Sequence, residues 1–181
     1  MTSRVKIFLA GFLNYLWNNI ITHIPLHFLR KIFLRLFNKN VSRSSVILLH
    51  VRILNFWSVE VGERAVINQY VLIDCRRYKV IIDHDADIGP YSRIWTTGHQ
   101  PDSNTHAING ANVIISHHVW IASGVTILPG ITIGAGAVIG TGSVVTRNIP
   151  CLEIWTGIPA KFSKKRNNEL TYKLNYQPYF E

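Results

Sequence analysis

Residues 115–150 read ISHHVW IASGVT ILPGIT IGAGAV IGTGSV VTRNIP, and each of these hexapeptides begins with an aliphatic residue. A second apolar or small residue follows four positions after each first one. A period of six does not fit an amphipathic α-helix, which repeats about every 3.6 residues, nor a meander of alternating hairpin strands. It fits short strands along the flat faces of a three-sided prism, with the aliphatic side chains inside. Gly and Asn then form the corners, where the chain turns tightly.

The same period occurs earlier in the chain, in two runs separated by a short insertion. The repeated aliphatic positions are Val61, Ile67, Ile73, Ile82, Ile88 and Ile94. Because three hexapeptides complete one coil, residues 61–78, 82–99, 115–132 and 133–150 predict four coils, and residues 47–60 add a looser one. In such a solenoid each coil stacks only on its neighbours. The sequence therefore predicts an all-β fold, a parallel β-helix.

Charge and cysteine content limit the partners. The 181-residue chain carries a formal net charge of +9, and its first acidic residue is Glu60. This balance favours anionic partners such as acidic lipid or a phosphorylated small molecule. We expect no nucleic-acid partner, because the chain has no recognition-helix or RNA-binding motif. Two cysteines are too few for a disulfide framework, so a reduced, cytoplasmic setting is expected.

The chain divides into a basic helical segment at residues 1–45, the β-helix at 46–160 and a basic C-terminal tail at 161–181. Within the first segment, helical periodicity predicts helices at 5–21 and 26–37. Large apolar residues beside basic ones favour a helix lying on an acidic membrane surface, at the inner face of the cell membrane. The alternative is a cap on the open end of the β-helix, whose last coil would otherwise leave backbone groups unpaired.

The repeat breaks between Ile94 and Ile115, and the polar residues 99–112 form a loop. Polar excursions from a rigid scaffold are where active-site residues tend to lie. His99 stands at the start of this loop, and an imidazole can accept a proton from a hydroxyl near neutral pH. We therefore expect His99 to be a general base. Asp102 or a backbone carbonyl could orient its second ring nitrogen.

Five motifs around this loop occur in a fixed order. They are TGHxP at 97–101, VWI at 119–121, ILPG at 127–130, GxGSVVTR at 140–147 and GxPAK at 157–161. Together, over residues 61–164, they resemble the hexapeptide-repeat acyltransferases of the galactoside, maltose and polysaccharide O-acetyltransferase type. The resemblance implies a left-handed prism, an exception to the usual hand of parallel crossovers. It also implies acetyl-CoA as acyl donor, no metal, and a homotrimer with each active site between two subunits.

The resemblance also implies residue roles. His99 matches the catalytic histidine, so its imidazole would deprotonate an acceptor hydroxyl that attacks the thioester. Asn68 and Trp120 match acceptor-binding positions, and Trp120 also lies beside the pantetheine arm. The other implied cofactor-binding residues are Ser123 and Thr141 for pantetheine, and Thr146, Arg147, Lys161 and Lys164 for the nucleotide end. Lys and Arg suit phosphates because they donate charge-assisted hydrogen bonds.

Two end segments narrow the expected acceptor. The pattern Ile24-Pro25-x4-Arg30 and residues 174–180 resemble the acetyltransferases of capsule, O-antigen and colanic acid gene clusters. They imply a sugar in a bacterial surface polysaccharide or its lipid-linked precursor. The loop after His99 is shorter than in the galactoside enzymes and lacks their second histidine close behind, and His106 lies farther along. The acidic N-terminal segment of those enzymes is also missing.

Two alternatives from other classes remain. The same scaffold and base could transfer an acetyl group to the nitrogen of an amino sugar, or to a serine or drug acceptor. A non-catalytic or metal-dependent β-helix protein is the other alternative. Its candidate ligands are His84, His117 and His118, but neighbouring residues on a strand point in opposite directions. The sequence therefore predicts corner or surface histidines and no metal site.

Overall fold

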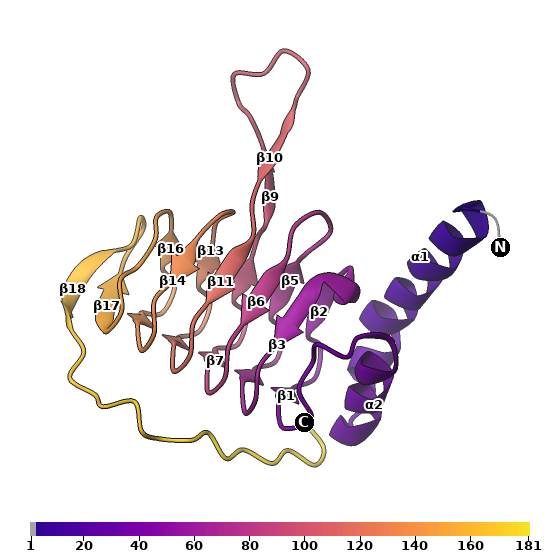
Figure 1. Ribbon diagram of the computed structural model, residues 1–181, viewed down its shortest axis with the longest axis horizontal. Helices are drawn as coiled ribbons and strands as arrows, with labels where there is room; N and C mark the ends of the chain where they lie inside the picture. The colour runs from indigo at the N-terminus through magenta and orange to yellow at the C-terminus, as the bar shows by residue number, and fades with distance from the viewer. Residues whose placement is uncertain (1–2) are drawn as a thin grey trace.

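The computed structural model describes residues 3–181 and is a three-sided parallel β-helix with two helices at one end (Figure 1). Face I consists of β3 (Val59–Val61), β6 (Val80–Ile82), β11 (Val113–Ile115) and β14 (Thr132–Ile133). Face II consists of β1 (Val46–Ile47), β4 (Val66–Ile67), β7 (Asp87–Ile88), β12 (Trp120–Ile121), β15 (Val138–Ile139), β17 (Glu153–Thr156) and β18 (Lys161–Lys165). Face III consists of β2 (Arg52–Leu54), β5 (Leu72–Asp74), β8 (Arg93–Ile94), β13 (Thr126–Ile127) and β16 (Val144–Val145). The chain visits the faces in the order I, II, III.

The interior confirms the six-residue repeat. The first residues of the hexapeptides in 115–150 are at most 1% exposed. On face II, Ile67 pairs with Ile88, Ile88 with Ile121, and Ile121 with Ile139, so equivalent side chains stack in a column. Burying each such side chain contributes about 1.5–3 kcal/mol. The looser coil is also in register, because β1 and β2 pair in parallel with β4 and β5.

The corner between faces I and II takes one residue with positive φ in each coil. These residues are Arg64, Asp85, His118, Gly136 and Leu152. Glycine adopts this left-handed conformation without strain, yet only one of the five positions holds glycine. Charged and imidazole side chains from successive coils are therefore brought into one column along this edge of the prism.

The N-terminal segment caps the first coil. It comprises α1 (Ser3–Asn19), the 3₁₀ turn η1 (Ile21–His23) and α2 (His27–Phe37), which agree with the predicted helices to within two residues. The Asn18 side chain donates to the Ile53 carbonyl (3.0 Å) and accepts from the Ile53 N–H (2.9 Å). His27 Nε2 accepts from the Ile47 N–H (3.2 Å). These bonds satisfy the free edge of β1 and β2. No helix within residues 3–181 combines the length and hydropathy needed to cross a bilayer.

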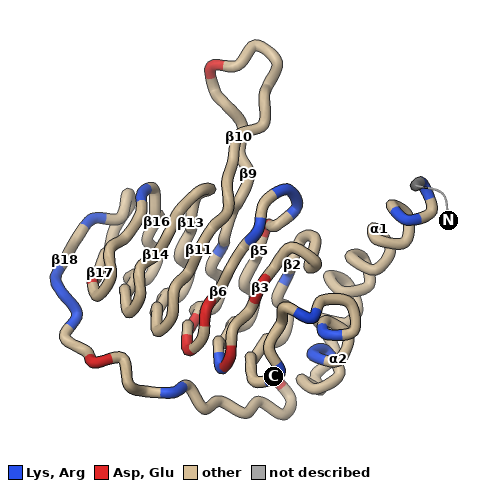
Figure 2. Tube along the Cα trace, viewed as in Figure 1, with Lys and Arg blue, Asp and Glu red and all other residues tan. Residues whose placement is uncertain are grey.

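The C-terminal segment returns along the prism to the helices (Figure 1). Residues 161–165, which the sequence assigned to the basic tail, form β18 at the edge of face II, and β18 pairs antiparallel with β17. Beyond β18 the chain follows the corner between faces I and II. Leu174 packs on Val46, Leu48 and Val66 of the first coils. Figure 2 shows the basic residues gathered near α2, at the loop between β5 and β6, and around β16 and β18.

Candidate active site

Two insertions project from the edge between faces III and I. The first is the loop of residues 75–79 between β5 and β6, and the second is the hairpin of β9 (Thr97–His99) and β10 (Ile108–Gly110). The hairpin stands away from the prism (Figure 1), and His99 lies opposite Ile108 in its antiparallel register. Both insertions line one open cavity, formed by Arg76, Arg77, Thr97, His99 and Ile108.

The hydrogen bonds of His99 define its chemistry. The side chain is exposed, and its Nδ1 lies 3.0 Å from the backbone carbonyl oxygen of His106. A carbonyl oxygen can only accept a hydrogen bond, so Nδ1 carries a proton, and in the neutral ring the lone pair is then on Nε2. The His106 ring stacks on the His99 ring with centroids 3.7 Å apart. The hydrogen bond and the stacking fix the ring, and His99 lines the cavity. The carbonyl, and not Asp102, orients the ring.

The candidate acceptor residues lie on face II. Trp120 is 49% exposed, and its register partner in the preceding coil is Asp87. Asn68 donates to Asp87 Oδ1 (2.8 Å) and to the Ile88 carbonyl (3.0 Å). Burial raises the pKa of the Asp87 carboxyl, and the hydrogen bond from Asn68 partly offsets this. Asn68, Asp87 and Trp120 thus form a polar and aromatic strip along the outer surface of face II.

The candidate cofactor residues are divided among several places. Ser123 and Thr141 lie at the corner between faces II and III, and the Gly142 N–H donates to the Ser123 carbonyl (2.9 Å). Thr146 and Arg147 follow β16 and are exposed at the edge that also carries the hairpin.

Lys161 and Lys164 are exposed on β18, opposite Thr156 and Ile154. Both belong to face II, beyond its last complete coil.

Within one chain, the candidate residues do not form a single pocket. His99 belongs to the edge between faces III and I, whereas Trp120 lies on face II and Asn68 at its junction with face III. The structure therefore brings Asn68 and Trp120 into one strip but does not join His99 to them.

Comparisons with known proteins agree with this fold. A family model described as bacterial transferase hexapeptide (six repeats) matches residues 112–147. The maltose O-acetyltransferase of Clostridium difficile 630 is 30% identical, with 89% of this chain and 86% of that one covered and a TM-score of 0.75. The chain belongs to the hexapeptide-repeat acyltransferase family. Family membership implies the left hand of the coil.

Two further solved acyltransferase structures share the fold. A hexapeptide-repeat acetyltransferase of Vibrio cholerae O1 biovar eltor, complexed with acetyl coenzyme A, is 21% identical, with a TM-score of 0.77 and coverage of 92% of this chain and 91% of that one. A galactoside acetyltransferase in complex with coenzyme A is 24% identical, with a TM-score of 0.75 and coverage of 100% and 92%. A search of curated protein sequences finds no significant match.

Sequence reasoning about this acyltransferase missed Asp87. The position just before the inward aliphatic residue points outward, and Val66, Trp120 and Val138 occupy it in the neighbouring coils. A carboxylate in this row is the signal that could have identified Asp87. Arg76 and Arg77 beside His99 were also missed, although their insertion interrupts the repeat visibly.

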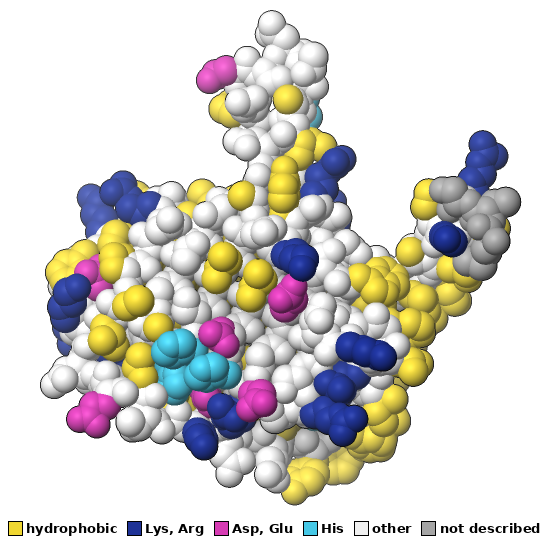
Figure 3. Space-filling view, in the orientation of Figure 1, with side chains coloured by type: hydrophobic (Ala, Val, Ile, Leu, Met, Phe, Trp, Pro, Cys, Tyr) yellow, Lys and Arg dark blue, Asp and Glu magenta, His cyan; other side chains and the backbone are white. Residues whose placement is uncertain are grey.

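A histidine cluster lies at the corner between faces I and II (Figure 3). The expectation that His117 and His118 diverge is wrong, because they occupy a turn and not a strand, and their Nδ1 atoms are 3.0 Å apart. Ligand atoms of His84, Asp85 and His118 lie within 4.8 Å of one another. They already have partners, however. Asp85 accepts from Arg64 and His84, and His118 Nε2 donates to the Tyr172 carbonyl (2.8 Å). The cluster therefore anchors the C-terminal segment.

Proposed function

We propose that this acyltransferase moves the acetyl group of acetyl-CoA to a hydroxyl group of a sugar. The observation that carries the proposal is the exposed His99 imidazole, whose Nδ1–H is bound to the His106 carbonyl and whose Nε2 has no hydrogen-bond partner among residues 3–181. The similarity to a maltose O-acetyltransferase supports a sugar acceptor. The similarity to proteins solved with acetyl coenzyme A and with coenzyme A supports the donor.

In the proposed reaction, Nε2 of His99 takes the proton of the acceptor hydroxyl as its oxygen attacks the thioester carbonyl. The resulting tetrahedral intermediate carries an oxyanion, which a backbone N–H would stabilise. Its collapse breaks the carbon–sulfur bond, and the departing thiolate takes the proton from the imidazolium. The products are an acetyl ester and coenzyme A, and the base returns to its starting form.

A homotrimer would complete the site. His99 and the strip of Asn68, Asp87 and Trp120 lie on different sides of one prism, so the hairpin of one subunit would face the strip of its neighbour. Ser123 and Thr141 would contact pantetheine, and the exposed Thr146, Arg147, Lys161 and Lys164 would hold the nucleotide phosphates. Light scattering at micromolar concentration tests the shared site, and a monomeric mass would contradict it.

The acceptor is proposed to be a sugar of a bacterial surface polysaccharide or its lipid-linked precursor. We place the enzyme in the cytoplasm, in peripheral contact with an acidic membrane through residues 1–45. Exposed large apolar side chains on α1 support this contact; Ile7 and Phe8 are 70% and 71% exposed. Basic residues beside such side chains favour an interfacial position.

N-acetylation of an amino sugar is the second candidate, and Asp87 favours it, because a carboxylate suits an amino group. One experiment decides between the two. The enzyme is incubated with acetyl-CoA and matched pairs of neutral and amino sugars, and the product masses are measured by mass spectrometry before and after treatment with mild alkali. An alkali-labile acetyl group on the neutral sugar supports O-acetylation. If acetyl groups are found only on the amino sugar and are stable to alkali, the enzyme is an N-acetyltransferase.

A further inference from the structure

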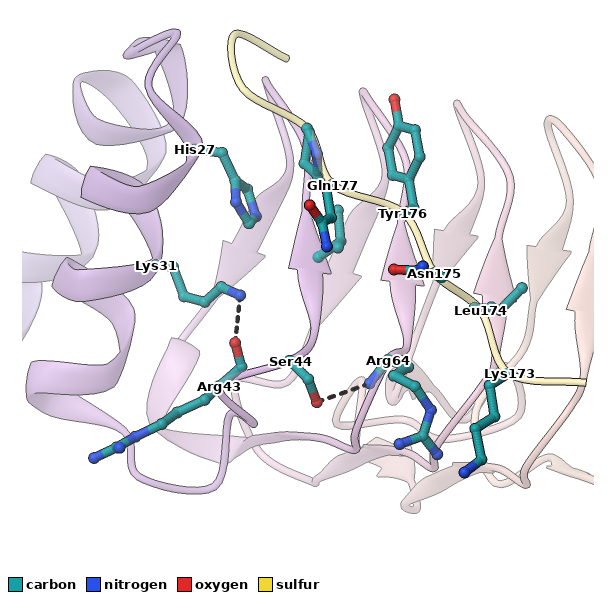
Figure 4. A pocket seen from close by; sticks show the side chains of 12 residues that line it. His27, Lys31, Arg43, Ser44, Arg64, Lys173, Leu174, Asn175, Tyr176 and Gln177 are labelled. Carbon is teal, nitrogen blue, oxygen red and sulfur yellow. Dashed lines mark hydrogen bonds between the residues drawn. The ribbon is translucent and has the colours of Figure 1, made fainter.

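A basic pocket lies where α2, the first corner of the prism and the C-terminal segment meet (Figure 4). Its volume is about 530 Å³, and Lys31, Arg43, Arg64 and Lys173 contribute basic side chains to its lining. None of the described residues that line it is acidic. These residues come from four separate segments of the chain, so the pocket is a product of the fold and not of a run of basic sequence.

Most of the positive charge in this pocket is unbalanced. Arg64 forms ion pairs with Asp85 and Glu63. Among residues 3–181, no carboxylate pairs with Lys31, Arg43 or Lys173. The Lys31 ammonium instead donates to the Arg43 carbonyl (2.5 Å; Figure 4). With no carboxylate to neutralise these side chains, a bound anion would supply the missing negative charge.

The histidine in the pocket is buried and lies near basic side chains. His27 is buried, and burial, followed by the positive charges of Lys31 and Arg30, lowers its pKa to about 4. Burial and the charge of Arg35 also lower the pKa of Lys31. Burial is the larger cause of both shifts and disfavours any charge, whereas the smaller contribution of the neighbouring Lys and Arg side chains would attract an anion.

An apolar hollow adjoins the basic pocket. His27, Lys31 and Arg43 line both, and the hollow adds Phe28, Ile32 and Leu36 of α2. These three side chains are 55%, 59% and 71% exposed and follow one another at intervals of four residues, so they share one face of the helix. A ligand that fits both regions has an anionic head and a hydrocarbon chain.

We propose that the basic pocket binds the phosphate group of a lipid whose hydrocarbon chain lies on Phe28, Ile32 and Leu36. A phosphate offers several oxygen acceptors to the Lys and Arg donors, whereas a carboxylate offers two. The proposal rests on the membrane contact proposed above and names the site that recognises the headgroup. Leu174, Asn175 and Tyr176 also line the cavity beside Asn68 and Asp87, so the lipid phosphate lies next to the acceptor strip.

The test titrates the full chain with dihexanoyl phosphatidic acid, a soluble lipid phosphate, by calorimetry at low salt. The variant Arg43→Glu/Lys173→Glu reverses two exposed charges of the pocket. Its matched control, Arg52→Glu/Arg93→Glu, reverses two exposed charges on face III. We expect the pocket variant to bind at least about tenfold more weakly and the control to bind like the wild type. Ile32→Ser should weaken binding about threefold by removing apolar contact.

Unchanged affinity in the pocket variant, or equal weakening in both double variants, would overturn the proposal. Inorganic pyrophosphate is the second probe. If it binds as tightly as the lipid, and Ile32→Ser has no effect on either, the ligand is a free phosphate compound and the lipid assignment is wrong.

Vesicles of phosphatidylcholine with and without phosphatidic acid separate the pocket from the membrane contact. If the wild type sediments with the acidic vesicles and the pocket variant does not, the result supports both the lipid-phosphate site and the membrane contact. If the wild type binds the soluble lipid but no vesicle, the site stands and the membrane contact fails. If the pocket variant and the wild type sediment with the acidic vesicles equally, the membrane contact is supported and the lipid-phosphate site is wrong.

Discussion

Replacing Asp85 by Asn should destabilise the prism through loss of one buried ion pair. The Asp85 side chain is 1% exposed and accepts two hydrogen bonds from Arg64, at 2.9 and 2.7 Å. His84 Nδ1 and the Leu174 N–H donate to it as well, both at 2.9 Å. Burial alone would raise the pKa of Asp85, but the hydrogen bonds from Arg64, His84 and Leu174 outweigh it and hold this pKa well below its usual range. The carboxylate is therefore charged in the folded protein.

The size of the effect follows from what remains after the substitution. Removing one partner of a buried ion pair typically costs about 3–5 kcal/mol, because the other charge is left buried. The Arg64 side chain is 27% exposed and keeps part of its hydration, so we expect about 2–4 kcal/mol for Asp85→Asn. The amide oxygen can still accept from the Leu174 N–H, so the C-terminal segment should stay attached.

The assay is urea unfolding followed by circular dichroism, at one protein concentration for all variants. Glu63→Gln is the matched control, because Glu63 pairs with the same guanidinium at 2.9 Å but is 67% exposed. An exposed pair contributes only about 0–1 kcal/mol. Similar small losses for Asp85→Asn and Glu63→Gln would refute the assignment of Asp85 as a buried structural charge.

Three further predictions concern the core, acid stability and the donor. Gly89→Ala should lose about 1–3 kcal/mol of unfolding free energy, because a Cβ at this position would lie 2.6 Å from the Ala122 carbonyl carbon. Gly98→Ala is the control, because its Cβ would have no neighbour nearer than 3.9 Å. Equal stabilities of the two variants would contradict the close approach of the coils. The folded pKa of His27, about 4, lies below its unfolded value of about 6.5. The free energy of unfolding should therefore be unaffected by His27 above pH 6.5 and should decrease as the pH falls toward 4, by about 3 kcal/mol at most. His27→Gln should flatten this part of the pH profile of urea unfolding, and an unchanged slope would show that another group titrates. Lys161→Ala should raise KM for acetyl-CoA with little change in kcat, while Arg52→Ala on β2 leaves both unchanged; an unaltered KM in Lys161→Ala would place the nucleotide elsewhere.

The repeat made the interior predictable from sequence. An inward aliphatic side chain every six residues leaves one way to stack the coils, and Ile121 and Ile127 are buried as expected. The N-terminal helices were predictable as well, and a cap on the open end of the β-helix was one of the two roles expected for them, but the residues that make the cap were not predicted. Asn18 is a polar residue in a largely apolar stretch, and only the structure shows that its amide bonds the backbone of Ile53.

Contacts between coils were harder to predict. Asp85 and His118 occupy equivalent corner positions of successive coils, but the hairpin is inserted between them and hides the equivalence. The Leu174 N–H bond to Asp85 joins residues far apart in sequence, and the six-residue repeat gives no indication of it.

The partner of His99 depended on hairpin register. A backbone carbonyl carries no sequence signature, so Asp102 and a carbonyl were equal candidates. The pairing of His99 with Ile108 brings the His106 carbonyl within reach of Nδ1. The repeat places Asp87 in the outward row, but its pairing with Trp120 became visible only when strand register was known.

The central claim is that the prism and its hairpin hold the His99 imidazole as the base of acyl transfer. The most direct measurement compares turnover of the wild type and His99→Ala on the acceptor found in the sugar panel, together with the dissociation constant for acetyl-CoA. The account predicts a loss in kcat of ~10²–10⁴-fold with donor binding unchanged. Turnover of His99→Ala at the wild-type rate, with the fold intact, would contradict it.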